Sequence, residues 1–170
     1  MKILVSWSSG KDSAWMLHVL KQQYPDAIAG LLTTTNQAFD RVAMHAVRRE
    51  LLDAQAQAAR LPLHVVPLPW PCSNEDYERL MSAEMEARRA DGYTHVAFGD
   101  LFLEDVRAYR ESKMAGTGLT PLFPLWKIAT TGDLDVTVRF SFGPEALLQT
   151  MRQLAEQSVD QLKKGQAVTF

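Results

Sequence analysis

A short stretch near the start of the chain, from Ser8 to Ser13, gathers hydroxyl groups, a glycine, a lysine and an aspartate. Small side chains let backbone N–H groups face an anion, and the lysine ammonium adds a mobile positive charge. The stretch joins an apolar run to an amphipathic one, which places it at a predicted helix N-terminus, where anions are stabilised. The pattern predicts a phosphate-binding loop for a nucleotide. The alternative is a plain strand-to-helix turn in which Asp12 or Ser13 only caps the helix.

The spacing in this loop excludes a Walker A motif, because Val5 stands where its first glycine would be and Asp12 separates Lys11 from Ser13. The loop resembles instead the S-G-G-x-D-S signature of the PP-loop ATP pyrophosphatases, with Ser9 in a position where that family usually has glycine. A left-handed backbone at Ser9 would cost about 1 kcal/mol that a glycine avoids. The resemblance implies that the loop binds the phosphates of ATP.

A second concentration of charge lies in residues 99–111, directly after the apolar run 95–98, and it contains four acids and two arginines. Carboxylates at a strand end can hold Mg²⁺ or orient an amine nucleophile, and arginine can bind a phosphate or a carboxylate through two parallel hydrogen bonds. The alternative is an exposed helix whose charges pair at neighbouring turns, as Glu104 with Arg107 would.

Together with the Pro-Leu-Phe-Pro-Leu-Trp run at 121–126, this segment looks like the second signature of one PP-loop branch, the diphthine–ammonia ligase (diphthamide synthase) type of ATP-binding protein. Residues 40–45 are similar to the same branch. The resemblance covers residues 1–126, which it marks as a PP-loop ATP-binding domain. It implies a parallel-sheet α/β fold, the Rossmann-like three-layer sandwich of the adenine nucleotide α-hydrolases (HUP/PP-loop class).

The activity implied by the resemblance is that of an AMP-forming, ATP-dependent ligase. A carboxylate of a small molecule or a protein attacks the α-phosphate, pyrophosphate leaves, and ammonia displaces AMP. Lys11 is expected to neutralise charge on the leaving pyrophosphate. Glu104, Asp105 and Arg107 are expected to orient the acyl substrate and ammonia. These four are the predicted catalytic residues.

ATP and Mg²⁺ are the expected cofactors. Asp12 and Asp100 are the predicted metal ligands. Backbone groups from Leu32 to Thr34 are expected to bind adenine at the end of the second strand. The residues predicted to bind ATP are Ser6, Ser8, Ser9, Gly10, Lys11, Asp12, Ser13, Leu32, Thr33, Thr34 and Gly99.

Apolar runs alternate with amphipathic segments in the sequence that must position these residues. Strands are predicted at 3–7, 28–33, 63–66 and 95–98, and helices at 12–22, 40–59 and from residue 74 onward. Helix 40–59 rests on the helical spacing of Met44, Val47, Leu51, Ala54 and Ala58. Such alternation predicts a parallel sheet, whose ligands gather at the carboxyl ends of the strands. The loops 8–13, 33–36, 67–70 and 99–105 are therefore expected to form one site.

Three further side chains near these loops are expected to have structural roles. His45 lies within the predicted second helix, where packing or surface exposure is favoured over a place in the site. Trp7 and Trp70 follow predicted strands and could flank adenine, but core packing is favoured for both.

Residues 127–170 depart from the resemblance, because the acidic segment expected there in the ligase family is missing. Strict alternation over 134–142 predicts a half-exposed strand, and Pro144 begins a predicted helix that ends at Gly165. We expect this extension to pack on the same domain or to pair with a second copy of the chain, giving a homodimer. A nucleotide-binding module without turnover is therefore an alternative to the ligase.

Composition narrows the function further. The net charge of −2 and the pI of 6.1 argue against a nucleic-acid partner. A third candidate function is that of a PP-loop tRNA-modifying enzyme. Such enzymes often have paired cysteines, and the single cysteine of this chain argues against that function. The sequence has no apolar run long enough for a membrane span and opens directly on a predicted strand, so we expect a cytoplasmic protein without a membrane partner. The four histidines lack the spacing of a metal site.

Overall fold

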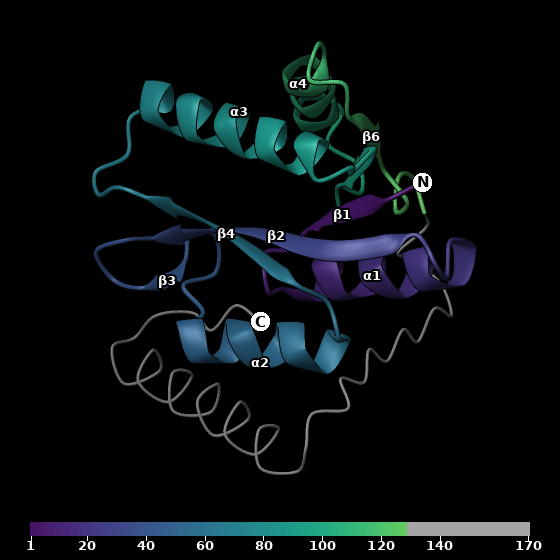
Figure 1. The fold of residues 1–170 in the computed structure, drawn as a ribbon, viewed down its shortest axis with the longest axis horizontal. Helices are drawn as coiled ribbons and strands as arrows, with labels where there is room; N and C mark the ends of the chain where they lie inside the picture. Colours follow the sequence, from purple (N-terminus) through teal and green to yellow (C-terminus); the bar gives the residue numbers. More distant parts are fainter. Residues whose placement is uncertain (129–170) are drawn as a thin grey trace. The chain divides into compact units, whose positions relative to one another are not determined.

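Strands and helices alternate in the computed structural model, which describes residues 1–128 (Figure 1). The fold is α/β, with one mixed and mostly parallel sheet of six strands. The strands are β1 (Ile3–Ser6), β2 (Ile28–Asn36), β3 (Arg41–Val42), β4 (Leu63–Leu68), β5 (His95–Ala97) and β6 (Thr120–Leu122). The helices are α1 (Lys11–Gln23), α2 (Arg49–Ala59), α3 (Asn74–Ala90) and α4 (Glu104–Met114).

The five parallel strands lie in the spatial order β4-β2-β1-β5-β6, and β3 pairs antiparallel with the last residues of β2. Val5 at the centre is opposite Leu31 on one side and Ala97 on the other. The order of the strands reverses at β1, since the chain first builds outward through β2 and β4 and then returns to β5. This arrangement is compatible with a Rossmann-like fold, in which ligands bind beyond the carboxyl ends of the strands at the reversal.

Helices cover both faces of the sheet: α1 and α2 lie on one face, and α3 and α4 on the other (Figure 1). Residues 3–5 of β1 are completely buried because the central strand is covered on both faces. On the α3 side, the core is a cluster of ten buried residues: Leu4, Leu32, Val66, Leu68, Met85, Tyr93, Val96, Phe98, Met114 and Leu119. Burial of this apolar surface is the main force that holds the strand ends in place.

The four predicted strands are present, and β2 and β4 each extend beyond their predicted ends. The predicted helix 12–22 is α1, and the helix predicted from residue 74 is α3. α3 begins there because Ser73 Oγ accepts a hydrogen bond from Asp76 N at 3.0 Å, which satisfies one of the free N–H groups of the first turn. The charged segment after β5 also forms a helix, α4, in which Arg107 pairs with Glu111 rather than Glu104.

The predicted helix 40–59 is wrong in its first part. β2 continues to Asn36, whose side-chain oxygen accepts a hydrogen bond from Ala38 N and turns the chain back into β3. Asp40 and Ala46 have positive φ angles, which a right-handed helix does not allow, and α2 begins only at Arg49. Strand pairing therefore overrides the helical spacing in this segment, and Met44 is 73% exposed.

β6 has no counterpart among the strands predicted from the sequence, and Pro121 lies at its centre. A proline lacks the N–H group that a central strand needs, but it is tolerated at the edge of a sheet. β6 pairs only with β5 among the strands of residues 1–128. β6 is therefore the edge strand of the sheet next to β5.

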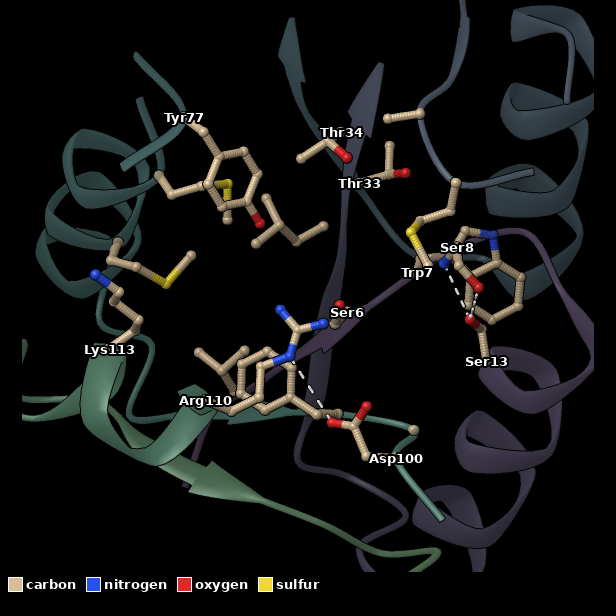
Figure 2. A pocket seen from close by; sticks show the side chains of 18 of the residues that line it. Ser6, Trp7, Ser8, Ser13, Thr33, Thr34, Tyr77, Asp100, Arg110 and Lys113 are labelled. Atoms are coloured by element: carbon tan, nitrogen blue, oxygen red, sulfur yellow. Dashed lines mark hydrogen bonds and ion pairs between the residues drawn. The ribbon is translucent and has the colours of Figure 1, made fainter. Parts of the chain in front are cut away.

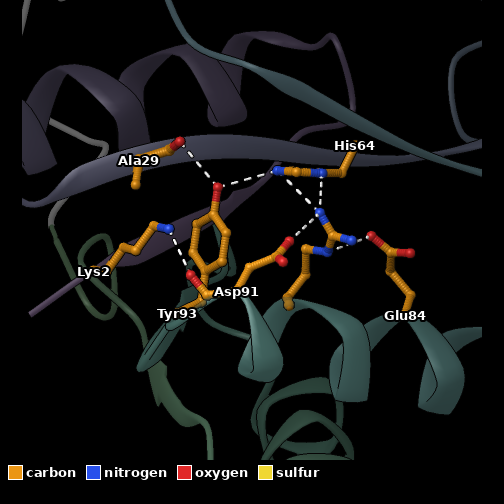
Figure 3. Close-up of polar contacts among 7 residues, drawn as sticks. Lys2, Ala29, His64, Glu84, Asp91 and Tyr93 are labelled. Atoms are coloured by element: carbon orange, nitrogen blue, oxygen red, sulfur yellow. Dashed lines mark hydrogen bonds and ion pairs between the residues drawn. The ribbon is translucent and has the colours of Figure 1, made fainter.

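A polar network joins β2, β4, α3 and the segment between α3 and β5 at the amino ends of the strands (Figure 3). Tyr93 Oη donates to Ala29 O at 3.0 Å and lies 3.1 Å from His64 Nε2, while Arg88 hydrogen-bonds to His64 Nδ1. Arg88 also pairs with Glu84 and Asp91, at 3.1 and 3.0 Å. Each of these side chains thus has a protein partner. A Cβ at Gly30 would collide with Tyr93 Oη, so the network requires a glycine in β2.

The chain divides into two compact units, residues 1–138 and residues 139–170. The strand and helix predicted for 134–142 and 144–165 lie outside the described residues. Within residues 1–128, no helix is long and apolar enough to cross a membrane.

Candidate functional site

The loop between β1 and α1 is closed by two serines. Ser13 Oγ accepts a hydrogen bond from Ser8 N at 2.9 Å and shares a hydrogen with Ser8 Oγ at 2.7 Å (Figure 2). Ser13 is in the first turn of α1, so this pair folds the loop back over the helix N-terminus. The N–H groups of that first turn have no partner within the helix and face the inside of the loop, which suits an anion.

The backbone of Ser9 is left-handed, with φ of 65°. This is the conformation that costs a serine more than the glycine usual at this position in the PP-loop signature. Its Oγ is buried and makes no hydrogen bond with any residue of the described part of the chain. The loop therefore carries strain of about 1 kcal/mol at this position. Gln55 of α2 supports the strained backbone, because it accepts from Trp7 Nε1 at 2.8 Å and donates to Ser9 O at 3.4 Å.

Gly10 is the N-cap of α1 and lies against His45 from the turn after β3. A Cβ at Gly10 would be 2.8 Å from His45 Nε2, so no larger residue fits without moving the imidazole. His45 is exposed at the mouth of the loop and lies outside any helix. From the sequence, helix packing or surface exposure is favoured for His45; the side chain is exposed, but it lies outside α2 and also lines the pocket described next.

A pocket of about 480 Å³ lies beyond the carboxyl ends of the strands, next to this loop. Nine predicted site residues line it: Ser6, Ser8, Asp12, Ser13, Leu32, Thr33, Thr34, Gly99 and Asp100. Pockets of this size hold small-molecule ligands in many proteins. Loops that are far apart in the sequence therefore meet at one place, as the predicted parallel sheet requires.

Six predicted residues do not line the pocket: Ser9, Gly10, Lys11, Glu104, Asp105 and Arg107. Ser9 and Gly10 lie in the loop Ser8–Ser13, which adjoins the pocket. Lys11 is at the surface beside the loop, with its side chain 79% exposed and its Nζ 2.7 Å from Asp12 Oδ1.

The α4 residues Glu104, Asp105 and Arg107 lie away from the pocket. Glu104 is exposed and lies 3.5 Å from the ammonium of Lys127. The guanidinium of Arg107 is 4.8 Å from the ring centres of both Phe123 and Trp126, and it pairs with Glu111 at 2.8 Å. Arg107 therefore packs α4 against the segment that follows β6, and the structure does not bring these three residues to the loop.

Arg110, which the sequence did not single out, lines the pocket together with Asp100. Its Nε is 3.8 Å from Asp100 Oδ2, and its guanidinium lies 5.0 Å from the centre of the Phe98 ring (Figure 2). Burial raises the pKa of Asp100, and the charge of Arg110 opposes that rise. Arg107 and Arg110 are one helical turn apart, so only the orientation of α4 determines which of them faces the pocket.

The end of β2 presents one buried hydroxyl to the pocket. Thr33 is 3% exposed, and its Oγ1 makes no hydrogen bond within residues 1–128. The carbonyls of Leu32 and Thr34, in contrast, accept from Trp7 N and Ala43 N. Side chains rather than backbone carbonyls are thus the groups of this strand that lack protein partners.

The tryptophans separate into two environments. Trp7 is 2% exposed, in agreement with core packing, and also borders the pocket. Trp70 is 66% exposed and meets Phe39 edge to face, so the hypothesis of core packing is wrong for it. It follows β4, beyond the end of the apolar core.

Three carboxylates line the pocket: Asp12, Glu78 and Asp100. Glu78 is paired with Lys113 at 2.5 Å. Asp12 and Asp100 lie beside Lys11 and Arg110 and are the two predicted ligands of a cation. No group of three or more histidine, cysteine, aspartate or glutamate side chains gathers in the described residues. Mg²⁺ commonly takes only one or two protein carboxylates and completes its shell with phosphate oxygens and water. The two aspartates therefore fit a magnesium–phosphate ligand better than a metal held by protein alone.

No protein-family model matches this chain, and a search of curated proteins finds no match. What the pocket binds must therefore be inferred from its own chemistry. It offers a helix N-terminus with hydroxyls, one buried threonine hydroxyl, an arginine, a lysine and three carboxylates.

Proposed function

We propose that residues 1–128 form a PP-loop, HUP-class nucleotide-binding domain that binds ATP with Mg²⁺, and that the protein is an AMP-forming ligase. One observation carries the proposal: the loop Ser8–Ser13 is held in a strained conformation over the N-terminus of α1 and adjoins a pocket where the strand order reverses. The loop places the hydroxyls of Ser8 and Ser13 beside the free N–H groups of the first helical turn, which favours an anion.

The rest of the pocket supports a nucleotide. The phosphates are assigned to Ser8, Ser13 and the N–H groups of α1, with Lys11 at the surface beside them. The base and ribose are assigned to the end of β2, where Thr33 Oγ1 needs a partner. Such a partner would recover the cost of a buried unpaired hydroxyl, about 1–3 kcal/mol.

Asp12 and Asp100 are the proposed ligands of Mg²⁺. When bound, Mg²⁺ would neutralise part of the phosphate charge that grows as pyrophosphate leaves. Lys11 contributes a second positive charge, because rotation of its exposed side chain can move the ammonium from Asp12 toward the phosphates.

The proposed reaction has two steps. A carboxylate oxygen forms a bond to the α-phosphorus, the bond from that phosphorus to the bridging oxygen breaks, and pyrophosphate leaves with the electron pair. Ammonia then attacks the acyl carbon, AMP leaves with the electron pair of the C–O bond, and the nitrogen loses one proton to give the amide. Holding the reactants in line contributes most of the acceleration in such transfers, and no nucleophilic side chain is required.

A second candidate is a nucleotide-binding module without turnover. The observation that favours it is the position of Glu104, Asp105 and Arg107 outside the pocket, since these residues were expected to orient the acyl substrate and ammonia. On this alternative the protein binds ATP and leaves it intact.

Calorimetry with MgATP tests the binding step. We expect Ser13→Ala to weaken binding at least about tenfold, because it removes the hydroxyl that closes the loop. Lys21→Ala, an exposed change in the last turn of the same helix, is the control and should bind as the wild type does. Absence of binding by the folded wild type at millimolar MgATP would contradict the proposal.

The turnover step is tested with carboxylic acids and hydroxylamine, an amine that traps acyl-adenylates as hydroxamates. Release of AMP and pyrophosphate that depends on the carboxylate supports the ligase. Intact bound ATP with every carboxylate supplied would support the binding module instead.

A further inference from the structure

The pocket has two walls of different chemistry. The wall next to α1 carries the hydroxyls of Ser6, Ser8 and Ser13. The opposite wall, from α3, α4 and the ends of β4 and β5, is mostly apolar. Figure 2 shows Tyr77 and Lys113 at this second wall, Ser8 and Ser13 at the first, and Arg110 between them. The apolar side chains of the second wall are Leu68, Met81, Met85, Phe98 and Met114.

The phosphates and ribose of a nucleotide are polar, so they do not match the apolar side chains of the second wall. Three of its side chains are methionines, which are flexible and polarisable and adapt to apolar ligands of different shape. Four side chains of the wall are already largely buried: Leu68, Met85, Phe98 and Met114. A flexible hydrocarbon chain would therefore fill the cavity beside them and contact the parts of these side chains that border it.

Arg110 stands at the junction of the two walls with an incomplete set of partners. Its Nε and Asp100 Oδ2 are both buried, and neither makes a hydrogen bond in the described part of the chain. Their separation of 3.8 Å is too long for a hydrogen bond. A carboxylate ligand would supply the acceptors that the guanidinium lacks, through two parallel N–H···O bonds.

The outer end of the second wall is electrically balanced. Lys113 Nζ lies 2.5 Å from Glu78 Oε1, and both side chains are partly exposed. A ligand that reaches this end therefore meets no uncompensated positive charge. A second carboxylate on the ligand would be left without a partner there, at a cost in binding.

We propose that this second wall is the subsite for the acyl substrate, that it takes a monocarboxylic acid with a flexible apolar chain, and that Arg110 binds the carboxylate. The inference rests on the proposed function, since it adds the second substrate to the ATP site. In this arrangement the substrate carboxylate lies between the apolar wall and the loop Ser8–Ser13. From there a carboxylate oxygen can approach the α-phosphorus of ATP.

The test uses octanoate and suberate, which have the same chain length and differ in one terminal carboxylate. Binding is measured by saturation-transfer NMR, with the protein saturated by the magnesium complex of α,β-methylene-ATP, which cannot release pyrophosphate. We expect octanoate to bind more tightly than suberate. Arg110→Gln should weaken octanoate at least about tenfold, and Arg79→Gln, a change of an exposed arginine outside the pocket, is the matched control.

Glu78→Gln gives a second, independent measurement. It removes the partner of Lys113 and should shift the preference toward suberate, which a merely structural role of Glu78 would not do. Octanoate binding that the ATP analogue abolishes, or that survives Arg110→Gln unchanged, would overturn the inference. If the wild type binds MgATP but neither acid, only this inference fails; if it does not bind MgATP, the proposed function fails as well.

Discussion

Polar side chains at the two ends of the sheet differ in how completely they are hydrogen-bonded within the protein. At the amino ends of the strands, the side chains of His64, Tyr93 and Arg88 are joined to one another and to their neighbours (Figure 3). At the carboxyl ends, Thr33 Oγ1 and Asp100 Oδ2 are buried and make no hydrogen bond within residues 1–128. Arg88 Nε of the amino-end network also makes no hydrogen bond in the described part of the chain, but it forms an ion pair with Glu84 at 3.1 Å. The contrast therefore rests on Thr33 Oγ1, whose burial without a partner costs about 1–3 kcal/mol unless a ligand completes it.

The amino-end network also has a defined protonation state. Arg88 can only donate, so His64 Nδ1 must accept, and Nε2–H then donates to Tyr93 Oη, which donates to Ala29 O. Neutral His64 satisfies every one of these bonds. A second proton on the imidazole would face the guanidinium of Arg88.

The largest effect is expected from Gly30→Ala, which breaks the amino-end network. The new methyl group would collide with Tyr93 Oη, and we expect the free energy of unfolding in urea to fall by about 3 kcal/mol. The double variant with Tyr93→Phe is the control, because it removes the atom in the way and should recover part of the loss. Equal stability of Gly30→Ala and wild type would contradict the packing described for β2.

A matched pair of hydroxyl deletions sharpens the comparison. Tyr93→Phe should lower stability by about 1 kcal/mol, because His64 and Ala29 lose a partner, and should leave MgATP binding unchanged. Thr33→Val should leave stability unchanged or slightly higher and weaken MgATP binding about threefold to tenfold. Urea titration and calorimetry on both variants measure the two effects. The reverse pattern would show that the distinction between the two ends is mistaken.

Ser9→Gly is expected to have a smaller, stabilising effect. Glycine relieves the left-handed strain but adds freedom to the unfolded chain, which leaves a gain of about 0.5 kcal/mol in thermal or urea unfolding. Ser9→Ala separates the two contributions, because it removes the buried hydroxyl and keeps the strain. Destabilisation by glycine would mean that the serine side chain stabilises the loop after all.

The smallest effect is expected in the pH dependence of the free energy of unfolding, which His64 causes in the network at the amino ends of the strands. Burial and the charge of Arg88 lower the pKa of His64 below its usual 6.5, so the unfolded chain takes up the proton first as pH falls. Stability is therefore complete above pH 6.5 and decreases as pH falls below it, down to the pKa of the folded state. Burial lowers the pKa of His95 as well, so the difference between wild type and His64→Gln isolates His64. Parallel pH profiles for the two proteins would contradict the assignment.

Sequence reasoning found most of the strands and helices, because alternating apolar and amphipathic runs are local signals. It failed where pairing between strands decides the structure: residues 40–48 carry helical spacing, yet the local hairpin that pairs Arg41 and Val42 with the end of β2 prevails. β6 was not predicted either, and its place at the edge of the sheet accommodates Pro121.

The candidate site was predicted best where the residues are consecutive. The turn from β1 into α1 over Ser8–Ser13 follows from a local pattern and is present. The left-handed backbone at Ser9, for which the sequence supported only a conditional cost, is an observation of the structure. The α4 residues depend on the rotation of a helix about its axis, which charge alone does not set. Arg107 turns to Phe123 and Trp126, and Arg110 turns to the pocket.

The central place of β1 determines when the site can form during folding. Lys2, just before β1, is hydrogen-bonded to Thr94, just before β5, and the two residues are 92 positions apart in the chain. Ser8–Ser13 leaves the ribosome well before Asp100 and Arg110, which follow it in the chain. Contacts between distant residues slow folding, because the chain between them must be ordered first. A nascent chain that ends before β5 contains the loop Ser8–Ser13 and the β4 and α3 parts of the second wall, but it lacks Phe98, Asp100 and α4 with Arg110. Formation of the complete pocket would therefore report completion of the sheet.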